Sequence, residues 1–367
     1  MSQGLRARDL GLPFSGIPGP FNAVTDVPGV LVGATTIVEG DGPLVAGRGP
    51  VRTGVTAILP SGREGELVPV WAGFHSFNGN GEMTGTHWID DAGYLVGPIC
   101  ITNTHSVGMV HHAATKWMIH TYPAFHEHHL WAMPVVAETY DGLLNDINGQ
   151  HVREEHVLRA LDTATGGPVP EGNVGGGTGM ICYEFKGGTG TSSRQITIDG
   201  TTHTVGALVQ ANHGQRDWLT ILGVPVGKHL VEDRISWREQ GSIIVVIGTD
   251  VPLLPTQLKR LAKRASIGIS RHGTPGGNNS GDIFLAFSTV NRGPLHGFAP
   301  AYLTLRALND EQLNSVYLAA VEAIEEAVVN AMVAARDTPT LRPPGRICRA
   351  IPHDRLVEVM RAYNRCA

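Results

Sequence analysis

The sequence predicts an α+β fold of stacked β-sheets with helices packed on their outer faces. Short runs rich in Val, Ile and Phe recur along the 367 residues, and these residue types fit the half-buried, pleated surface of a strand. Between them lie a few segments with apolar residues at helical spacing. Because strand and helix segments do not alternate strictly, we expect layers of α and β structure.

The expected strands are short apolar or alternating runs. They cover residues 55–59, 68–77, 99–102, 135–139, 204–210, 242–248 and 282–289. Glycine is abundant, with 47 residues, and serves tight turns and close backbone approach. Many short strands and backbone-lined sites are therefore expected.

Two helices are expected between these strands. Residues 152–161 carry apolar residues at helical spacing. Residues 255–266 begin with Pro255, which suits the first turn of a helix, and Gly268 follows to close it.

The clearest helix lies near the C-terminus. Asn309 or Asp310 can cap its start, and apolar residues between Leu313 and Met332 form one stripe along it. The proline-containing segment TPTLRPP ends this pattern, and a short tail helix is expected from Asp354.

Composition and charge exclude several classes of protein. With 42% hydrophobic and 17% charged residues, the chain has an ordinary globular composition, and its length suits one large domain or two. The net charge of -5, with 28 scattered basic residues, gives no nucleic-acid footprint. The first residues lack the apolar run of a signal peptide, and no stretch is long and apolar enough to span a bilayer. We therefore expect a cytoplasmic protein with neither nucleic-acid nor membrane partners.

The cysteines support the same location. Cys100, Cys182, Cys348 and Cys366 lie far apart and form no CxxC pair, so neither a zinc site nor a disulfide framework follows. Reduced thiols are the simplest interpretation.

Several motifs indicate chemistry only weakly. The run 126–129 (HEHH) fails the zincin spacing because position 130 is Leu130. The glycine runs 175–179 and 187–191 match neither a P-loop nor a dinucleotide fingerprint, and no serine sits in GxSxG. His105 could be a catalytic base, although a structural histidine on a turn is the favoured interpretation.

The strongest local signal is residues 276–282 (GGNNSGD), directly before an expected strand. A serine hydroxyl is a poor nucleophile unless a base takes its proton. At a chain N-terminus the serine's own α-amine, with a pKa of about 7.7–8.0, can be that base. Ser280 would reach this state if its oxygen attacked the Asn279 carbonyl and water resolved the ester. The flanking glycines allow such a strained loop, although NSGD alone is also an ordinary turn.

Ordered blocks over nearly the whole chain resemble a known family. They are RARDLGLPF from Arg6, NAVTDVPGV from Asn22, AGFHSFNGNGEMTG from Ala72, ITNTHSVG from Ile101, VAETYDG from Val136, GNVGGGTGM from Gly172, LVQAN from Leu208 and GTPGGNNSGDIFLAFST from Gly273. This pattern is similar to the DmpA-like peptidases, which comprise L-aminopeptidase/D-Ala-esterase/amidases and β-peptidyl aminopeptidases.

The resemblance implies a fold and a processing event. It implies one domain over residues 1–367, built as a four-layer αββα sandwich like that of the Ntn hydrolases but with different connectivity. It implies self-cleavage into an α-chain of residues 1–279 and a β-chain of residues 280–367. It also implies a homo-oligomer of such αβ units, often four.

The resemblance also assigns site residues. Ser280 is the implied nucleophile, and Asn212 the side-chain amide that faces the oxyanion, a donor typically contributing about 2.7–4 kcal/mol. Glu138 is the implied carboxylate for the free amine of the substrate, which would select an aminopeptidase reaction. Tyr140 is implied near the reacting carbonyl. Without the resemblance, a turn asparagine, a solvated glutamate and a packing tyrosine would be favoured.

The C-terminal helix departs from the family pattern. The family often carries a hydroxyl residue two positions before a glutamate close to the nucleophile. Here these positions are Ile324 and Glu326, so only the glutamate is retained as a catalytic candidate. Ser288 is an alternative hydroxyl further along the strand, and Glu326 could equally be a surface charge.

The combined prediction is a serine aminopeptidase that needs no metal or organic cofactor. It would release N-terminal L-, small D- or β-amino acids from short peptides, amides and esters through an acyl-enzyme on Ser280. One alternative is an amino-acid N-acyltransferase, although the similar self-cleaving ornithine acetyltransferases use threonine as nucleophile. The other is an uncleaved, non-catalytic binding homologue.

Overall fold

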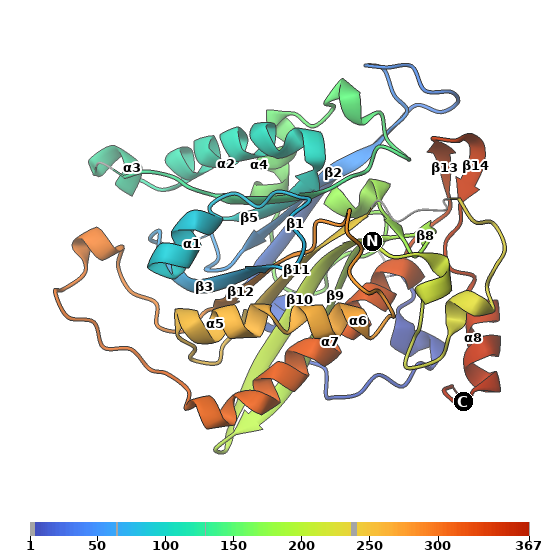
Figure 1. Cartoon of the computed structure of the whole chain (residues 1–367). Helices are drawn as coiled ribbons and strands as arrows, with labels where there is room; N and C mark the ends of the chain where they lie inside the picture. Colours follow the sequence, from blue (N-terminus) through green and yellow to red (C-terminus); the bar gives the residue numbers. More distant parts are fainter. Residues whose placement is uncertain (1–3, 64, 129, 236–240, 367) are drawn as a thin grey trace.

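Two β-sheets lie face to face between two layers of helices (Figure 1). The computed structural model describes residues 4–63, 65–128, 130–235 and 241–366. The first sheet has the order β1-β2-β5-β6 and consists of β1 (Leu31–Glu39), β2 (Val51–Leu59), β5 (Ile99–Asn103) and β6 (Val135–Thr139). The second has the order β4-β3-β12-β11-β10-β9 and consists of β4 (Tyr94–Val96), β3 (Pro69–Ser76), β12 (Ile283–Ser288), β11 (Ser242–Thr249), β10 (Thr201–Asn212) and β9 (Gly188–Ile198).

Most neighbouring strands are antiparallel, whereas β5–β6 and β11–β12 are parallel. Two small hairpin sheets lie outside the sandwich: β7 (Ile181–Cys182) with β8 (Phe185–Lys186), and β13 (Thr338–Leu341) with β14 (Pro344–Cys348).

The helices cover both outer faces (Figure 1). The first sheet carries α2 (Val107–Thr121) and α4 (Glu154–Asp162), and the second carries α5 (Pro255–Ala262), α6 (Ala265–Ser270) and α7 (Leu313–Val333). The remaining α-helices are α1 (Thr86–Ala92), α3 (Ala124–Glu127) and α8 (His353–Ala362). Short 3-10 helices join these elements: η1 (Ala7–Leu10), η2 (Val24–Asp26), η3 (Thr104–Ser106), η4 (Ile147–Gly149), η5 (Gly175–Gly179), η6 (Arg216–Trp218), η7 (Val226–Lys228), η8 (His296–Phe298) and η9 (Asp310–Gln312).

Three apolar layers hold the sandwich together, one between the sheets and one under each helix layer. Strand β11 shows how one sequence serves two of them. Ile243, Val245 and Ile247 join the core under α7, whereas Ile244 and Val246 join the core between the sheets. Because side chains alternate along a strand, a strand buried on both faces needs a continuous apolar run. The predicted αββα sandwich is confirmed.

The sequence located seven strands and the helices α4, α7 and α8, but it missed other elements, among them β1, β9 and α2, and misjudged one helix. Residues 255–266 form two helices with a break at Lys263 and Arg264. Gly268 lies inside α6, where an added Cβ would come 2.8 Å from the Ile324 Cβ, so this glycine allows helix packing and does not end a helix. Strand β9 was not predicted, because its first half is rich in glycine, threonine and serine. Those small residues let α7 approach closely: a Cβ at Gly190 would lie 2.0 Å from the Ala327 carbonyl oxygen.

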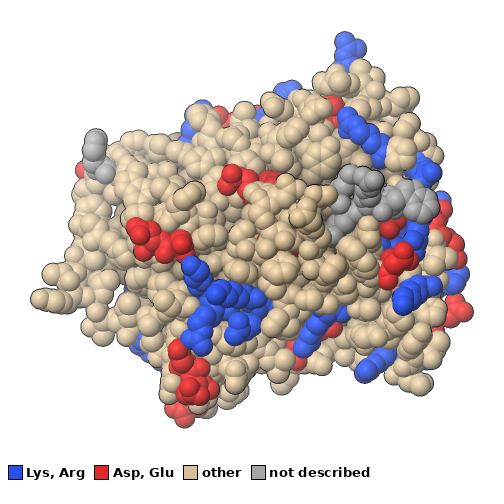
Figure 2. Space-filling model, in the orientation of Figure 1, with Lys and Arg blue, Asp and Glu red and all other residues tan. Residues whose placement is uncertain are grey.

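The surface carries mixed charge. In Figure 2, basic and acidic side chains lie beside one another in the region of α5. The ion pairs Lys259–Asp90 and Arg260–Asp310 occur there. Within the described ranges, no helix has both the length and the apolar composition needed to cross a membrane.

Candidate active site

Ser280 lies just before β12, in the middle of the larger sheet. It is fully buried, and its backbone N–H donates to the Gly277 carbonyl at 3.0 Å. The strand that follows is buried on both faces and pairs with β3 and β11. The apolar run of β12 therefore fixes the serine at the entrance of a rigid strand.

A carboxylate that the sequence interpretation did not assign holds the Ser280 hydroxyl. Ser280 Oγ donates to Asp282 Oδ1 at 2.5 Å. Oδ1 also accepts the Ile243 N–H at 3.2 Å, and Oδ2 accepts the Asn78 side-chain amide at 3.1 Å. Burial raises the pKa of Asp282, and these hydrogen bonds partly oppose the rise. The spacing of two residues in extended chain is a signal that could have identified Asp282, because it places both side chains on one face.

Two asparagines from the loop after β3 contact the segment around Ser280. Asn80 Nδ2 donates to the Asn279 carbonyl at 2.6 Å, and Asn78 Nδ2 donates to the Gly277 carbonyl at 3.1 Å. A Cβ added at Gly281 would lie 2.4 Å from the Asn80 carbonyl oxygen. The glycine after the serine is therefore required for this backbone contact.

Asn212 lies beside the serine segment but does not touch the serine hydroxyl. It ends β10 opposite Ser242 of β11, and Ser242 Oγ accepts the Gly281 N–H at 3.0 Å. The Asn212 side chain is buried, accepts the Ile181 N–H at 2.8 Å and donates to the Tyr140 carbonyl at 3.0 Å. Asn212 is thus a fixed residue at a strand end, with one of the two N–H donors of its amide engaged.

The carboxylate of Glu138 lies close to the segment that carries Ser280. It accepts the Glu82 N–H at 3.0 Å and the Thr104 hydroxyl. A Cβ added at Gly81 would lie 3.1 Å from Glu138 Oε1 and 3.2 Å from the Gly281 Cα, so these two groups face each other across one glycine. Burial raises the pKa of Glu138. In the described ranges no basic side chain forms an ion pair with this carboxylate.

Tyr140 follows the end of β6, and its side chain is 39% exposed. Its hydroxyl packs against Gly142, where an added Cβ would lie 2.3 Å from the hydroxyl oxygen. The structure links Tyr140 to the site through its carbonyl, which accepts the Asn212 amide. A role for the Tyr140 side chain at the reacting carbonyl stays a prediction.

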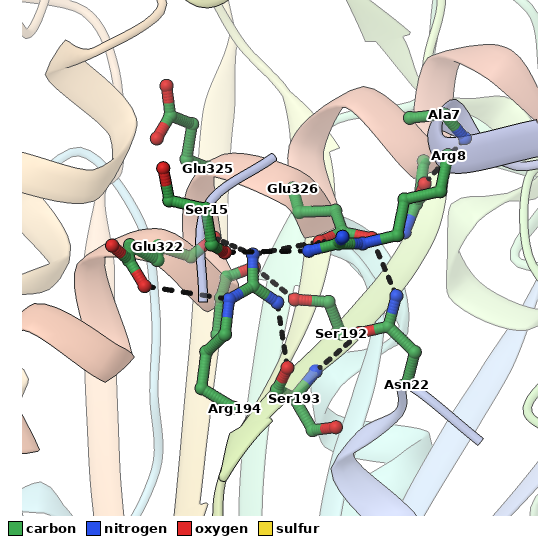
Figure 3. A network of polar contacts seen from close by, with 12 residues as sticks. Ala7, Arg8, Ser15, Asn22, Ser192, Ser193, Arg194, Glu322, Glu325 and Glu326 are labelled. Atoms are coloured by element: carbon green, nitrogen blue, oxygen red, sulfur yellow. Dashed lines mark hydrogen bonds and ion pairs between the residues drawn. The ribbon is translucent and has the colours of Figure 1, made fainter. Parts of the chain in front are cut away.

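The structure separates Glu326 from Ser280. Glu326 is fully buried, and its carboxylate accepts hydrogen bonds from Arg8 (2.9 Å), Arg194 (2.8 Å) and Asn22 (2.6 Å), as Figure 3 shows. Arg194 lies on the edge strand β9, and pairing across β10 and β11 places it level with Ser288, at the far end of β12 from Ser280. The closeness to the nucleophile that the resemblance implies is therefore not found.

The other hydroxyl positions lie elsewhere as well. Ile324 packs against Gly268 between α7 and α6. Ser288 Oγ donates to the Val251 carbonyl at 2.7 Å. Neither residue contacts the Ser280 segment.

The weaker motifs have structural explanations where they are described. The glycine run of η5 is buried against β2, and a Cβ at Gly175 would lie 2.3 Å from the Thr56 hydroxyl. The His105 N–H donates to the Asn103 side chain at 3.1 Å. His126 lies on α3, and His129 lies outside the described residues. In the described part of the chain, no group of three His, Cys, Asp or Glu side chains could hold a metal ion.

A buried serine hydrogen-bonded to a carboxylate, at the start of a central strand of an αββα sandwich, fits a serine hydrolase. Comparisons with known proteins agree. The model of peptidase family S58 matches residues 22–343. The chain is 50% identical over 382 residues to β-peptidyl aminopeptidase BapA of Sphingosinicella microcystinivorans, an alignment covering 100% of this chain and 94% of that protein.

Solved structures are similar over nearly their whole length. The L-aminopeptidase D-Ala-esterase/amidase of Ochrobactrum anthropi, described as a variant of the Ntn hydrolase fold, is 59% identical, with a TM-score of 0.94 and 99% of each chain covered. A Burkholderia sp. β-aminopeptidase is 48% identical, with a TM-score of 0.89 and 98% of this chain and 99% of that chain covered. The chain belongs to peptidase family S58 and is a serine aminopeptidase.

Proposed function

We propose that this peptidase matures by cutting its own chain between Asn279 and Ser280. The cut would leave residues 1–279 and 280–367 as two chains of one folded domain. The observation that carries this proposal is the hydrogen bond from the buried Ser280 Oγ to Asp282, because a carboxylate at 2.5 Å can take the hydroxyl proton. The new α-amine of Ser280 would then serve as the base for substrate hydrolysis.

The mature enzyme would act on small substrates with a free amine. Glu138 would bind the ammonium group, and Ser280 would attack the neighbouring carbonyl to form an acyl-enzyme that water resolves. Substrates would be short peptides, amides and esters that begin with an L-, a small D- or a β-amino acid. The names of the relatives from Sphingosinicella and Ochrobactrum support this range. Asn212 and Tyr140 would assist at the reacting carbonyl, with the second N–H of the Asn212 amide as donor while the first stays on the Tyr140 carbonyl.

Intact-mass measurement tests the proposal. The parent protein is expected to give two fragments, the smaller beginning at Ser280, and Ser280→Ala one full-length chain. Hydrolysis of β-alanyl, D-alanyl and L-residue amides by the parent alone would then establish aminopeptidase action. A parent chain that stays whole after prolonged incubation, yet is folded, would contradict self-processing.

We further propose that the two-chain units assemble into a homo-oligomer, for which four units is the expected number. The segment between β12 and α7 exposes large apolar side chains, with Tyr302 92% exposed and Phe298 50% exposed. It projects from the body of the molecule (Figure 1, orange loop). Exposed apolar groups on an extended arm suit contact with another copy. Light scattering during size-exclusion chromatography measures the mass, and a single 39.1 kDa unit would contradict the proposal.

A further inference from the structure

The peptide bond between Asn279 and Ser280 is hydrogen-bonded at both ends. Its carbonyl oxygen accepts the Asn80 side-chain amide at 2.6 Å, and its N–H donates to the Gly277 carbonyl at 3.0 Å. One N–H of the Asn212 amide donates to the Tyr140 carbonyl, and Asn212 forms no hydrogen bond to the Asn279–Ser280 peptide bond. In the uncut chain, the side-chain donor on the Asn279 carbonyl is therefore Asn80.

The backbone on either side of Asn80 is anchored to the segment that it contacts. Before it, the Phe77 N–H donates to the Asp282 carbonyl at 2.9 Å, and the Asn78 side chain binds Gly277 and Asp282. After it, the Glu82 N–H donates to the Glu138 carboxylate at 3.0 Å. The Asn80 carbonyl itself lies against Gly281. Hydrogen bonds on both sides thus place the Asn80 amide before any charge develops, as an oxyanion donor requires.

We propose that Asn80 is the catalytic oxyanion donor of self-cleavage, a role separate from that of Asn212 in substrate hydrolysis. This inference rests on the proposed self-processing. Ser280 Oγ forms a bond to the Asn279 carbonyl carbon, and the carbonyl π electrons move to the oxygen that Asn80 binds. The proton of Oγ passes to Asp282 and then to the Ser280 nitrogen as the C–N bond breaks. This step leaves an ester and a free amine.

Water completes the reaction. It adds to the ester carbonyl, whose oxygen again carries negative charge beside Asn80, and the bond to Ser280 Oγ breaks. The products are the Asn279 carboxylate and the free hydroxyl and amine of Ser280. Asn279 and Asn80 are exposed whereas Ser280 is buried, so solvent reaches the ester from the Asn279 side. Because the donor is exposed, its contribution should fall near the lower end of the roughly 10²–10³-fold found for single oxyanion donors.

Timed cell-free synthesis, quenched with denaturant and read by intact mass, tests the proposal. Asn80→Ala and the isosteric Asn80→Asp, which has no amide donor, are expected to slow cleavage about 10²-fold. Asn173→Ala is the matched control, because Asn173 Nδ2 donates to the Arg336 carbonyl at 3.1 Å on a loop that does not contact Ser280. Circular dichroism and thermal unfolding compare the folded state of each variant with that of Ser280→Ala.

The outcomes separate the two proposals. Folded Asn80→Asp or Asn80→Ala protein that is cleaved at the parent rate would overturn the role of Asn80 and leave the proposed function intact. A parent chain that is never cleaved would overturn self-processing and this inference together. Slow cleavage in both variants, with the control at the parent rate, supports Asn80 as the donor.

Discussion

Two buried carboxylates of this molecule have opposite surroundings. Glu326 accepts hydrogen bonds from two guanidinium groups, those of Arg8 and Arg194, and from the Asn22 amide (Figure 3). Asp282 is held by a serine hydroxyl, an asparagine amide and a backbone N–H, and in the described ranges no cation pairs with it. Both are almost inaccessible to solvent. The difference lies in whether positive charge compensates the burial.

That difference separates a structural carboxylate from a reactive one. In Glu326 the guanidinium groups balance the negative charge of the buried carboxylate. Their hydrogen bonds also join three segments of the chain, the N-terminal segment, β9 and α7. An uncompensated carboxylate has a raised pKa and a ready tendency to take a proton, which is what a base beside a nucleophile needs. Glu138 shares this state, and its missing partner is the proposed substrate ammonium.

The largest effect is expected at the uncompensated carboxylate. Asp282→Asn keeps the shape of the side chain but removes the proton acceptor, so self-cleavage should slow about 10²–10⁴-fold. Timed intact-mass measurement gives the rate, and Asn173→Ala again serves as the control. Cleavage of folded Asp282→Asn within a few-fold of the parent rate would show that another group takes the serine proton.

The compensated carboxylate should affect stability, not chemistry. Glu326→Ala leaves Arg194 buried with its main partner gone, and should lower the free energy of unfolding by about 3–5 kcal/mol. Urea denaturation of Ser280→Ala and of the double variant measures this on uncut chains. Glu358→Ala, an exposed residue of α8, is the control and should change stability by less than about 0.5 kcal/mol. Unchanged stability with slower turnover per folded site would instead place Glu326 in the reaction, as the resemblance implies.

The strands, Ser280 and Glu326 show how much of the fold and of the site the sequence could predict. Strand β11 was found because burial on both faces leaves an uninterrupted apolar run at residues 243–247. Ser280 was singled out by a local signal, the segment GGNNSGD before an expected strand, and the resemblance assigned it as the nucleophile. Glu326 was placed beside the nucleophile by the family resemblance. Its partner Arg8 lies 318 residues away, and a pattern along the chain carries no record of that contact.

The missed site residues follow the same rule. Asn80 and its partner Asn279 are 199 residues apart, and the loop that carries Asn80 shows only turn chemistry in sequence. Asp282 could have been identified from the sequence, since its spacing of two residues from Ser280 predicts that both side chains lie on one face of the extended chain. Its importance depends on burial without a cation, which is a property of the folded molecule.

Glu138 should give a smaller effect, confined to substrate binding. Glu138→Gln removes the charge that would pair with the substrate ammonium, and KM should rise about 10- to 100-fold, equivalent to the roughly 1.5–3 kcal/mol of a charged hydrogen bond. Steady-state kinetics on β-alanyl amide measure it on fully cleaved enzyme. Glu358→Gln is the control, because it removes an exposed carboxylate of α8 whose partner is Arg355. An unchanged KM in folded Glu138→Gln would assign amine binding to another residue.

The smallest effect is the pH dependence of self-cleavage. Asp282 accepts the serine proton only as a carboxylate, and burial raises its pKa. The rate should therefore fall as the pH decreases through that raised pKa, by at most tenfold per pH unit, with a midpoint above the value of about 3.9 for an ordinary aspartate. Purified Asn80→Ala precursor, which is expected to cleave slowly enough to isolate, allows the rate to be followed across pH. A midpoint at or below 3.9, or the same profile in an Asn80→Ala/Asp282→Asn double variant, would show that Asp282 does not titrate in this step. The unpaired carboxylate of Asp282 would then result from burial alone, and its contrast with Glu326 would not mark it as the base of self-cleavage.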